Sequence, residues 1–234
     1  MIVYRRSEKR GHADKGWLDS FHTFSFADYK DPNHNGFRSL RVLNEDRVEA
    51  GRGFGAHGHR DMEIISYVIS GKLGHKDSMG HEEVLGANEI QVMSAGSGVV
   101  HSEFNASKTD PVHFLQIWIE PTGKGLVSNY QQLAFAGSEK LGAWRLLASP
   151  DGGSGIAQLQ QDASVSITEL SPGEERPYSL KPGRHAWIQV VSGHVLLNGE
   201  ALRSGDAAAI SEEHLLTLNG AGNAASEVML FDLA

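Results

Sequence analysis

Short runs of β-forming residues recur along the chain, and glycine or other turn residues end most of them. The run at residues 64–69, for example, ends at Ser70-Gly71, and no long helical pattern separates it from the next run. Strands spaced at roughly 8–12 residues are typical of a β-sandwich or a small β-barrel. The 27 glycines of the 234 residues agree with this, because they are scattered singly as turn residues. We therefore expect an all-β fold with few short helices.

The second half of the chain echoes the first. Tyr67-Val68-Ile69-Ser70-Gly71 is matched by Gln189-Val190-Val191-Ser192-Gly193. A repeat close to domain size predicts two similar barrels, and a chain of 234 residues can form two small domains. We expect an N-terminal barrel over residues 1–125, a weakly helical linker over 126–136 and a C-terminal barrel over 137–234.

Two short pieces carry closely spaced side chains that can bind metals. They are His57-Gly58-His59 and His101-Ser102-Glu103. Residues two apart on a strand share a face, so each piece presents two such side chains in one direction. Three imidazoles and one carboxylate on one wall would bind a transition metal, and this set suits iron and its neighbours. The predicted metal site is therefore His57, His59, His101 and Glu103, with open positions for chemistry on dioxygen.

Two alternatives remain open at the level of spacing. Most of the twelve histidines must be structural or solvated, and a lone His-x-His is weak support for a metal site. The His-x-Glu of the second piece makes the metal site the better interpretation. Glu63 follows His59 by four residues and would share its face on a regular strand, so spacing does not choose between Glu63 and Glu103.

The repeat also indicates where a second site would lie. Counting from Gly193 and Asp206, the positions equivalent to the N-terminal histidines and carboxylates hold other residues, among them Ser179, Lys181 and Leu218. The remaining histidines of the second half do not reproduce the pattern. We therefore expect one metal per chain, in the first barrel, and a second barrel without metal ligands.

The composition of the chain excludes several kinds of site and opposes several kinds of partner. The chain has no cysteine, which excludes disulfides, thiolate metal sites and cysteine nucleophiles. A net charge of −8 opposes binding to nucleic acid or to an anionic membrane, and no apolar run approaches the ~18 residues of a membrane span. No signal peptide is recognisable. A cytoplasmic monomer is the simplest expectation.

Four stretches together carry a family resemblance. They are GWLDSFHTFSF at residues 16–26, LRVLNED at 40–46, FGAHGH at 54–59 and HSE at 101–103. The paired histidine motifs resemble those of the cupin superfamily, and the four stretches together resemble the pirin family more specifically. The resemblance covers most of residues 1–120 and is more diffuse afterwards. It implies two tandem cupin barrels of the double-stranded β-helix type, with one metal, usually iron, in the first barrel.

The resemblance also implies a ligand choice and an activity. In pirin-like proteins the carboxylate ligand stands at the position of Glu103, which leaves Glu63 as a structural or outer-sphere residue. Some members have quercetin 2,3-dioxygenase activity, so we expect Fe(II), or another divalent metal in its place, and a flavonol as the small aromatic substrate. Glu103 would act as the general base, and ring cleavage would release carbon monoxide. The alternative is a metal-dependent redox sensor or regulatory binding protein without enzymatic activity.

Other residues are weaker candidates. Aromatic and apolar side chains that could pack near the cavity are Phe21, Phe24, Phe26 and Ile65. Histidines that could lie behind the ligands are His22, His75 and His113. For all of them an ordinary place in the core or at the surface is the simpler interpretation.

Overall fold

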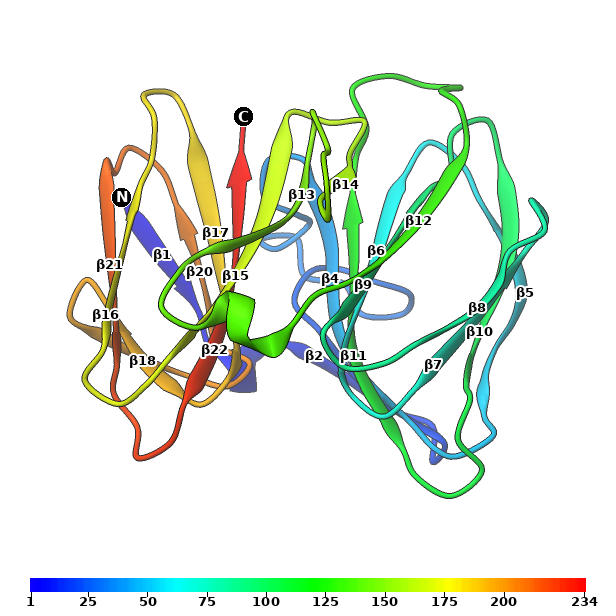
Figure 1. Ribbon diagram of the computed structural model, residues 1–234, viewed down its shortest axis with the longest axis horizontal. Helices are drawn as coiled ribbons and strands as arrows, with labels where there is room; N and C mark the ends of the chain where they lie inside the picture. Colours follow the sequence, from blue (N-terminus) through cyan, green and yellow to red (C-terminus); the bar gives the residue numbers. More distant parts are fainter. The chain divides into compact units, whose positions relative to one another are not determined.

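The computed structural model describes all residues from Met1 to Ala234, and nearly all of its regular structure is β-strand. The chain forms two compact units (Figure 1). One, which we call the site unit, contains Gly11–Phe135 and Asp151–Gln161. The other, which we call the C-terminal unit, contains Met1–Arg10, Ala136–Pro150 and Asp162–Ala234. The expected all-β fold of two barrels is confirmed. No helix of the structure is long and apolar enough to cross a membrane.

The site unit consists of two sheets. The larger has the strand order β12-β9-β6-β11-β4-β3-β2, and the smaller has the order β5-β10-β7-β8. Their strands are β2 (Gly11–Asp14), β3 (Leu18–His22), β4 (Leu40–Val48), β5 (Gly53–His59), β6 (Glu63–Ser70), β7 (Leu73–Asp77), β8 (Glu82–Leu85), β9 (Glu89–Ser94), β10 (Val99–Asn105), β11 (Val112–Ile119) and β12 (Asn129–Ala134). The short strand β14 (Ala157–Gln158) also belongs to this unit, where Gln131 bonds to the backbone of Gln158.

The C-terminal unit has the same plan. One sheet contains the order β1-β20-β17-β22-β15-β13, and the other has the order β16-β21-β18-β19. Its elements are β1 (Ile2–Arg5), η1 (Ser7–Lys9), η2 (Gly137–Lys140), β13 (Arg145–Ser149), β15 (Ala163–Leu170), β16 (Glu175–Ser179), β17 (His185–Ser192), β18 (His194–Leu197), β19 (Glu200–Arg203), β20 (Ala207–Ile210), β21 (Leu215–Gly220) and β22 (Ser226–Leu233).

The units differ from the expected ranges at both ends of the site unit. The segment expected as a weakly helical linker contains β12, which pairs along its length with β9 of the larger sheet. The first residues form β1, which pairs with β20 of the C-terminal unit, and Ile2 and Tyr4 pack on that unit's core. Both differences arise from pairing with distant strands, which local composition does not encode. Residues 151–161, expected in the C-terminal barrel, also belong to the site unit.

Strand β4 contains residues that often form turns. Asn44-Glu45-Asp46 is such a stretch, but β4 runs unbroken from Leu40 to Val48 and pairs with β11 and β3. Its even-numbered polar residues therefore point to one face of the sheet and its odd-numbered residues to the other. The turn propensity of Asn and Asp is overridden by pairing on both sides of the strand.

Each unit has its own buried apolar core. In the site unit, Val68, Leu73 and Phe114 belong to one cluster, and Ile64, Met93 and Val99 form another. In the C-terminal unit, Leu216 and Leu218 of β21 are fully buried in a larger cluster. Leu218, the position that counting along the repeat matches to His101, is thus part of the hydrophobic core.

The repeated glycine turns explain part of the shared plan. Gly71 and Gly193 both have positive φ, 83° and 84°. A Cβ on Gly71 would lie 2.6 Å from the Pro111 carbonyl oxygen, and one on Gly193 would lie 2.7 Å from Ser226 Cα. At each position only glycine satisfies both the left-handed backbone and the close approach of a neighbouring strand.

We expect Gly71→Ala to destabilise the site unit more than Gly16→Ala. Gly16 has nearly the same φ, 79°, but a Cβ at this position would have no other atom within 4 Å. Its replacement should cost only the backbone strain of about 1–2 kcal/mol, whereas Gly71→Ala adds a backbone clash. Chemical denaturation of both variants measures this. Equal losses of unfolding free energy would show that the close approach is unimportant.

Candidate metal centre

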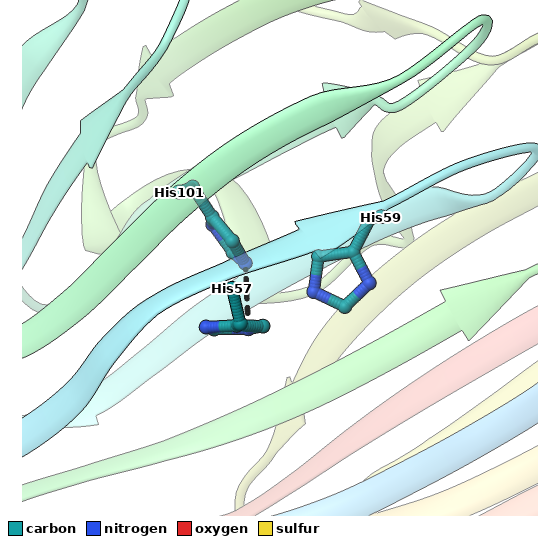
Figure 2. Close-up of side chains that lie close together, drawn as sticks. All are labelled: His57, His59 and His101. Carbon is teal, nitrogen blue, oxygen red and sulfur yellow. Dashed lines mark hydrogen bonds between the residues drawn. The ribbon is translucent and has the colours of Figure 1, made fainter.

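The pairing of β5 with β10 positions three histidines. The strands are antiparallel, with His101 opposite His57 and Val99 opposite His59. His57 and His59 share a face because they are two residues apart on β5. Figure 2 shows the three imidazoles gathered where the two strands meet. The structure thus brings together three of the four residues predicted as metal ligands.

A β-bulge in this pair changes the register beyond His101. The shift lies between His101 and Glu103, so that Glu103 is opposite Phe54 and not opposite Gly55. An extra residue on β5 turns Phe54 toward the interior, where it lines the same cavity as Glu103. Bulges of this kind are common next to functional sites, because they change the direction of a side chain without ending the sheet.

The three imidazoles are close enough to share one ion. Nε2 of His101 lies 3.1 Å from Nε2 of His57, and one potential ligand nitrogen from each ring lies within 4.8 Å of the others. His57 Nδ1 lies 2.8 Å from the Gly55 carbonyl oxygen. If Nδ1–H donates this bond, the ring presents the lone pair of Nε2 to the group.

An unpaired buried nitrogen in the same group fits a metal. Nε2 of His59 is buried without a hydrogen-bond partner. Burial, followed by the neighbouring histidines, lowers the pKa of His59 to about 4 and that of His101 to about 3. The rings are therefore neutral at physiological pH, which is the form that binds metals. Ligand nitrogens at ~2.1 Å from one ion would lie ~3 Å apart at right angles, close to the separation found for His57 and His101.

Glu103 faces the interior but is not a member of the histidine group. Its side chain is 2% exposed, and it accepts hydrogen bonds from Ser66 Oγ at 3.1 Å and from Gln116 Nε2 at 2.9 Å. It therefore reaches from β10 to strands β6 and β11 of the opposite sheet. Burial and the charge of Asp46 raise its pKa to about 7, although the two hydrogen bonds act in the other direction.

The histidine group opens onto a cavity of about 710 Å³ inside the site unit. The walls carry aromatic side chains from β5, β11 and the segments before and after β3: Trp17, Phe26, Tyr29, Phe54, Phe114 and Trp118. Trp118 packs edge-on against His59 with ring centroids 4.9 Å apart, and Phe26 packs edge-on against Trp118. A cavity of this size with aromatic walls can hold a small aromatic molecule.

Polar groups that the sequence analysis missed line the cavity as well. Ser20 Oγ donates to Asp46 Oδ1 and lies 2.9 Å from His22 Nε2, and Asn44 lies two residues before Asp46 on the same face of β4. Alternation along residues 40–48 could have identified Asn44 and Asp46. Their turn-forming character hid that signal.

The other predicted residues have varied positions. Phe26 and His22 line the cavity, whereas Phe21, Phe24 and Ile65 do not. Buried Glu63 accepts hydrogen bonds from Ser94 and from the backbone of Gln160, away from the histidine group. His75 is buried behind His101 and bonds to Asp77, and His113 bonds to Glu45.

The fold and the site define a bicupin: two β-barrel units, one of them with a histidine group that faces a cavity. The Pirin family profile matches residues 3–119, and a profile described as the quercetinase C-terminal cupin domain matches residues 146–233. The chain belongs to the pirin family.

Relatives extend this similarity over the full length. The chain is 45% identical to the quercetin 2,3-dioxygenase of Escherichia coli K12, covering 100% of this chain and 99% of that protein. The crystal structure of YhhW from Escherichia coli superposes with a TM-score of 0.95 at 44% identity, covering 100% of this chain and 98% of that one. The structure of the bacterial pirin YhhW in complex with nickel(II) gives a TM-score of 0.93 at 45% identity, with 100% and 99% covered.

Asp46 provides a test of the electrostatics of the cavity. Burial, and then the charges of Glu45 and Asp19, raise its pKa to about 7, although the Ser20 hydrogen bond acts in the other direction. Between pH 4 and 7 the unfolded chain, with a pKa near 3.9, releases this proton before the folded protein does. Asp46 therefore stabilises the fold less as the pH rises.

We expect Asp46→Asn to remove this dependence. The unfolding free energy of the variant, relative to the wild type, should increase from pH 4.5 to pH 8 by up to roughly 3 kcal/mol. Urea denaturation of both metal-free proteins at several pH values measures it, and the comparison cancels the titration of the histidines. A difference that stays constant with pH would show that Asp46 titrates normally.

Proposed function

We propose that the protein is a metal-dependent dioxygenase that cleaves a flavonol such as quercetin. The observation that carries the proposal is the group of His57, His59 and His101, of which His57 and His59 line an aromatic-walled cavity. The full-length similarity to a protein named quercetin 2,3-dioxygenase supports the reaction class. The name alone would not suffice, because one fold can support many activities.

We assign His57, His59, His101 and Glu103 as the metal ligands and Fe(II) as the metal. The nickel(II) complex of the bacterial pirin YhhW supports a divalent transition metal in a fold of this kind. Three imidazoles with one carboxylate suit iron as well as its neighbours. When bound, such an ion would polarise the chelating oxygens of the substrate and orient them for reaction with dioxygen.

The protein's own groups would bind the substrate and exclude water. The cavity volume of about 710 Å³ lies within the ~300–1,000 Å³ typical of small-molecule sites. Trp17, Phe54 and Trp118 provide flat apolar walls that can pack against the rings of a flavonol. Displacing water from these walls strengthens the electrostatic interactions of the reacting groups.

Glu103 is suited to take the proton of the flavonol hydroxyl. Its carboxyl has a raised pKa of about 7 in the metal-free protein, and on leaving the metal its carboxylate would be free to accept the hydroxyl proton. Ser66 and Gln116 each donate a hydrogen bond to one of its two carboxyl oxygens. These two bonds fix the orientation of the side chain and therefore the position at which it would receive the proton. A base positioned in this way typically contributes ~10²–10⁴-fold to the rate. Ring cleavage with release of carbon monoxide completes the proposed reaction.

The decisive experiment is turnover of quercetin under air by protein loaded with Fe(II). We expect activity in the wild type, its loss in His59→Ala, and wild-type activity in His214→Ala, a matched control at an exposed histidine of the C-terminal unit. Loss of absorbance of quercetin and detection of carbon monoxide are the measurements. Chelation should abolish activity and leave the β-sheet circular dichroism intact, because each unit has its own apolar core.

The outcomes separate the alternatives. Wild-type protein that binds one metal per chain but does not turn over quercetin would favour a sensor or regulatory protein that uses the same site. Protein that binds no metal would contradict both functions. Oxygen consumption without carbon monoxide would retain the dioxygenase and contradict the proposed products.

The carboxylate assignment has its own test. We expect Glu103→Ala to weaken metal binding by more than the ~10–100-fold typical for loss of an outer-sphere partner. Glu63→Ala should leave most of the metal bound, because Glu63 bonds to Ser94 and Gln160 and not to the histidine group. Competition with a chromophoric chelator measures both affinities. The reverse order of losses would assign Glu63 as the ligand.

A further inference from the structure

A second polar wall lines the cavity, and it comes from the other sheet. The histidine group stands on β5 and β10 of the smaller sheet, whereas Ser20, Asn44 and Asp46 stand on β3 and β4 of the larger one. The pairing registers place Ser20 beside Asp46 and Asn44 between His22 and Gln116. These side chains are therefore neighbours on one face of the sheet, and that face borders the cavity.

Asn44 is the most informative member of this wall. Its side chain is 2% exposed, and its Oδ1 atom is buried without a hydrogen-bond partner. A buried amide oxygen without a partner destabilises the fold, and native proteins rarely retain one without a reason. Because Asn44 borders the cavity, a bound molecule can supply the missing donor.

Asp46 offers a second acceptor close by. It is 5% exposed, and Ser20 is its only hydrogen-bond partner, bonded to Oδ1. The other carboxyl oxygen is not used by the protein. Residues two apart on a strand are separated by roughly 7 Å along it, so Asn44 and Asp46 can each receive a donor from one rigid molecule.

The chemistry of the wall selects the ligand class. The unpaired Asn44 Oδ1 and the second Asp46 oxygen favour a ligand that carries hydrogen-bond donors, and nearby Glu103 would repel a carboxylate or phosphate group. The surrounding aromatic walls favour a flat ring. The indole Nε1 of Trp118 is a buried donor without a partner on the same cavity, and a phenolic hydroxyl, which donates and accepts, matches both kinds of group.

We propose that Asn44 and Asp46 form a subsite that recognises phenolic hydroxyl groups on the part of the substrate that lies away from the metal. The inference rests on the proposed function and goes beyond it, because the metal site would select only the chelating hydroxyl and carbonyl. With this subsite, the affinity of the protein for a flavonol depends on the hydroxyl groups of the rings that do not chelate the metal. A buried acceptor rejects an analogue that lacks the matching hydroxyl, since that acceptor then stays unpaired.

The test compares two ligands with two variants. Quercetin and 3-hydroxyflavone share the chelating hydroxyl and carbonyl, but 3-hydroxyflavone lacks the other hydroxyls. Calorimetric titration of Ni(II)-loaded protein without dioxygen measures binding in the absence of turnover. We expect Asn44→Leu to weaken quercetin binding about tenfold, the effect of losing a hydrogen bond and leaving a hydroxyl unpaired, and to leave 3-hydroxyflavone binding within about twofold.

Controls distinguish recognition from a general defect. Arg41 lies near the start of the same strand and does not line the cavity. The Arg41→Gln variant should therefore bind both ligands as the wild type does. Asn44→Leu should unfold at the same temperature as the wild type or higher, because no hydrogen bond to Oδ1 is lost. Asp46→Asn, which keeps the acceptor for Ser20, gives a second variant and should also weaken quercetin binding selectively.

The results that contradict the inference are distinct from those that contradict the function. Equal losses for both ligands in Asn44→Leu and Asp46→Asn, or equal affinities of the two ligands for the wild type, would overturn the subsite and leave the dioxygenase proposal standing. A wild type that binds neither ligand would overturn the proposed function and the subsite with it.

Discussion

The register between β5 and β10 is the constraint on which the site depends. It places His101 opposite His57, and the bulge on β5 beyond this pair turns Phe54 toward the cavity that Glu103 also lines. A shift of one residue would turn every histidine to the other face of the sheet. The pairing of β10 with β7 on its other side holds this register, because His101 is also opposite Asp77. The geometry of the site is thus set by backbone pairing before any ion binds.

The polar groups that line the cavity destabilise the fold, and the apolar clusters around them offset this effect. Asn44, Asp46 and Glu103 are buried polar groups, and the pKa values of both carboxyls are raised to about 7. Such groups weaken a fold unless partners compensate. Ser20, Ser66 and Gln116 supply part of the compensation. Apolar clusters in the same unit, such as the one with Val68 and Phe114, keep the barrel closed.

The sequence predicted the local spacing of the histidines better than it predicted the long-range pairing of the strands. The His-x-His spacing was enough to predict that His57 and His59 share a face, because alternation along a strand is a local property. Their closeness to His101 was expected from the motifs, but it depends on the long-range pairing of β5 with β10. The places of β1 and β12 were not predictable in this way, since each depends on a partner strand far along the chain. Asn44 and Asp46 were missed because their local turn propensity opposes the strand in which they lie.

Comparison of the two units separates what the fold requires from what the site requires. Gly71 and Gly193 retain the same left-handed turn, so the turn belongs to the barrel and not to the metal site. On β21, the strand of the C-terminal unit that corresponds to β10, the side chains of Leu216 and Leu218 are fully buried among other apolar side chains. A barrel of this plan therefore closes on an apolar core without ligands. The histidines and the polar wall of the site unit are thus additions to a scaffold that is stable without them, which is why their substitution is expected to change binding before it changes the fold.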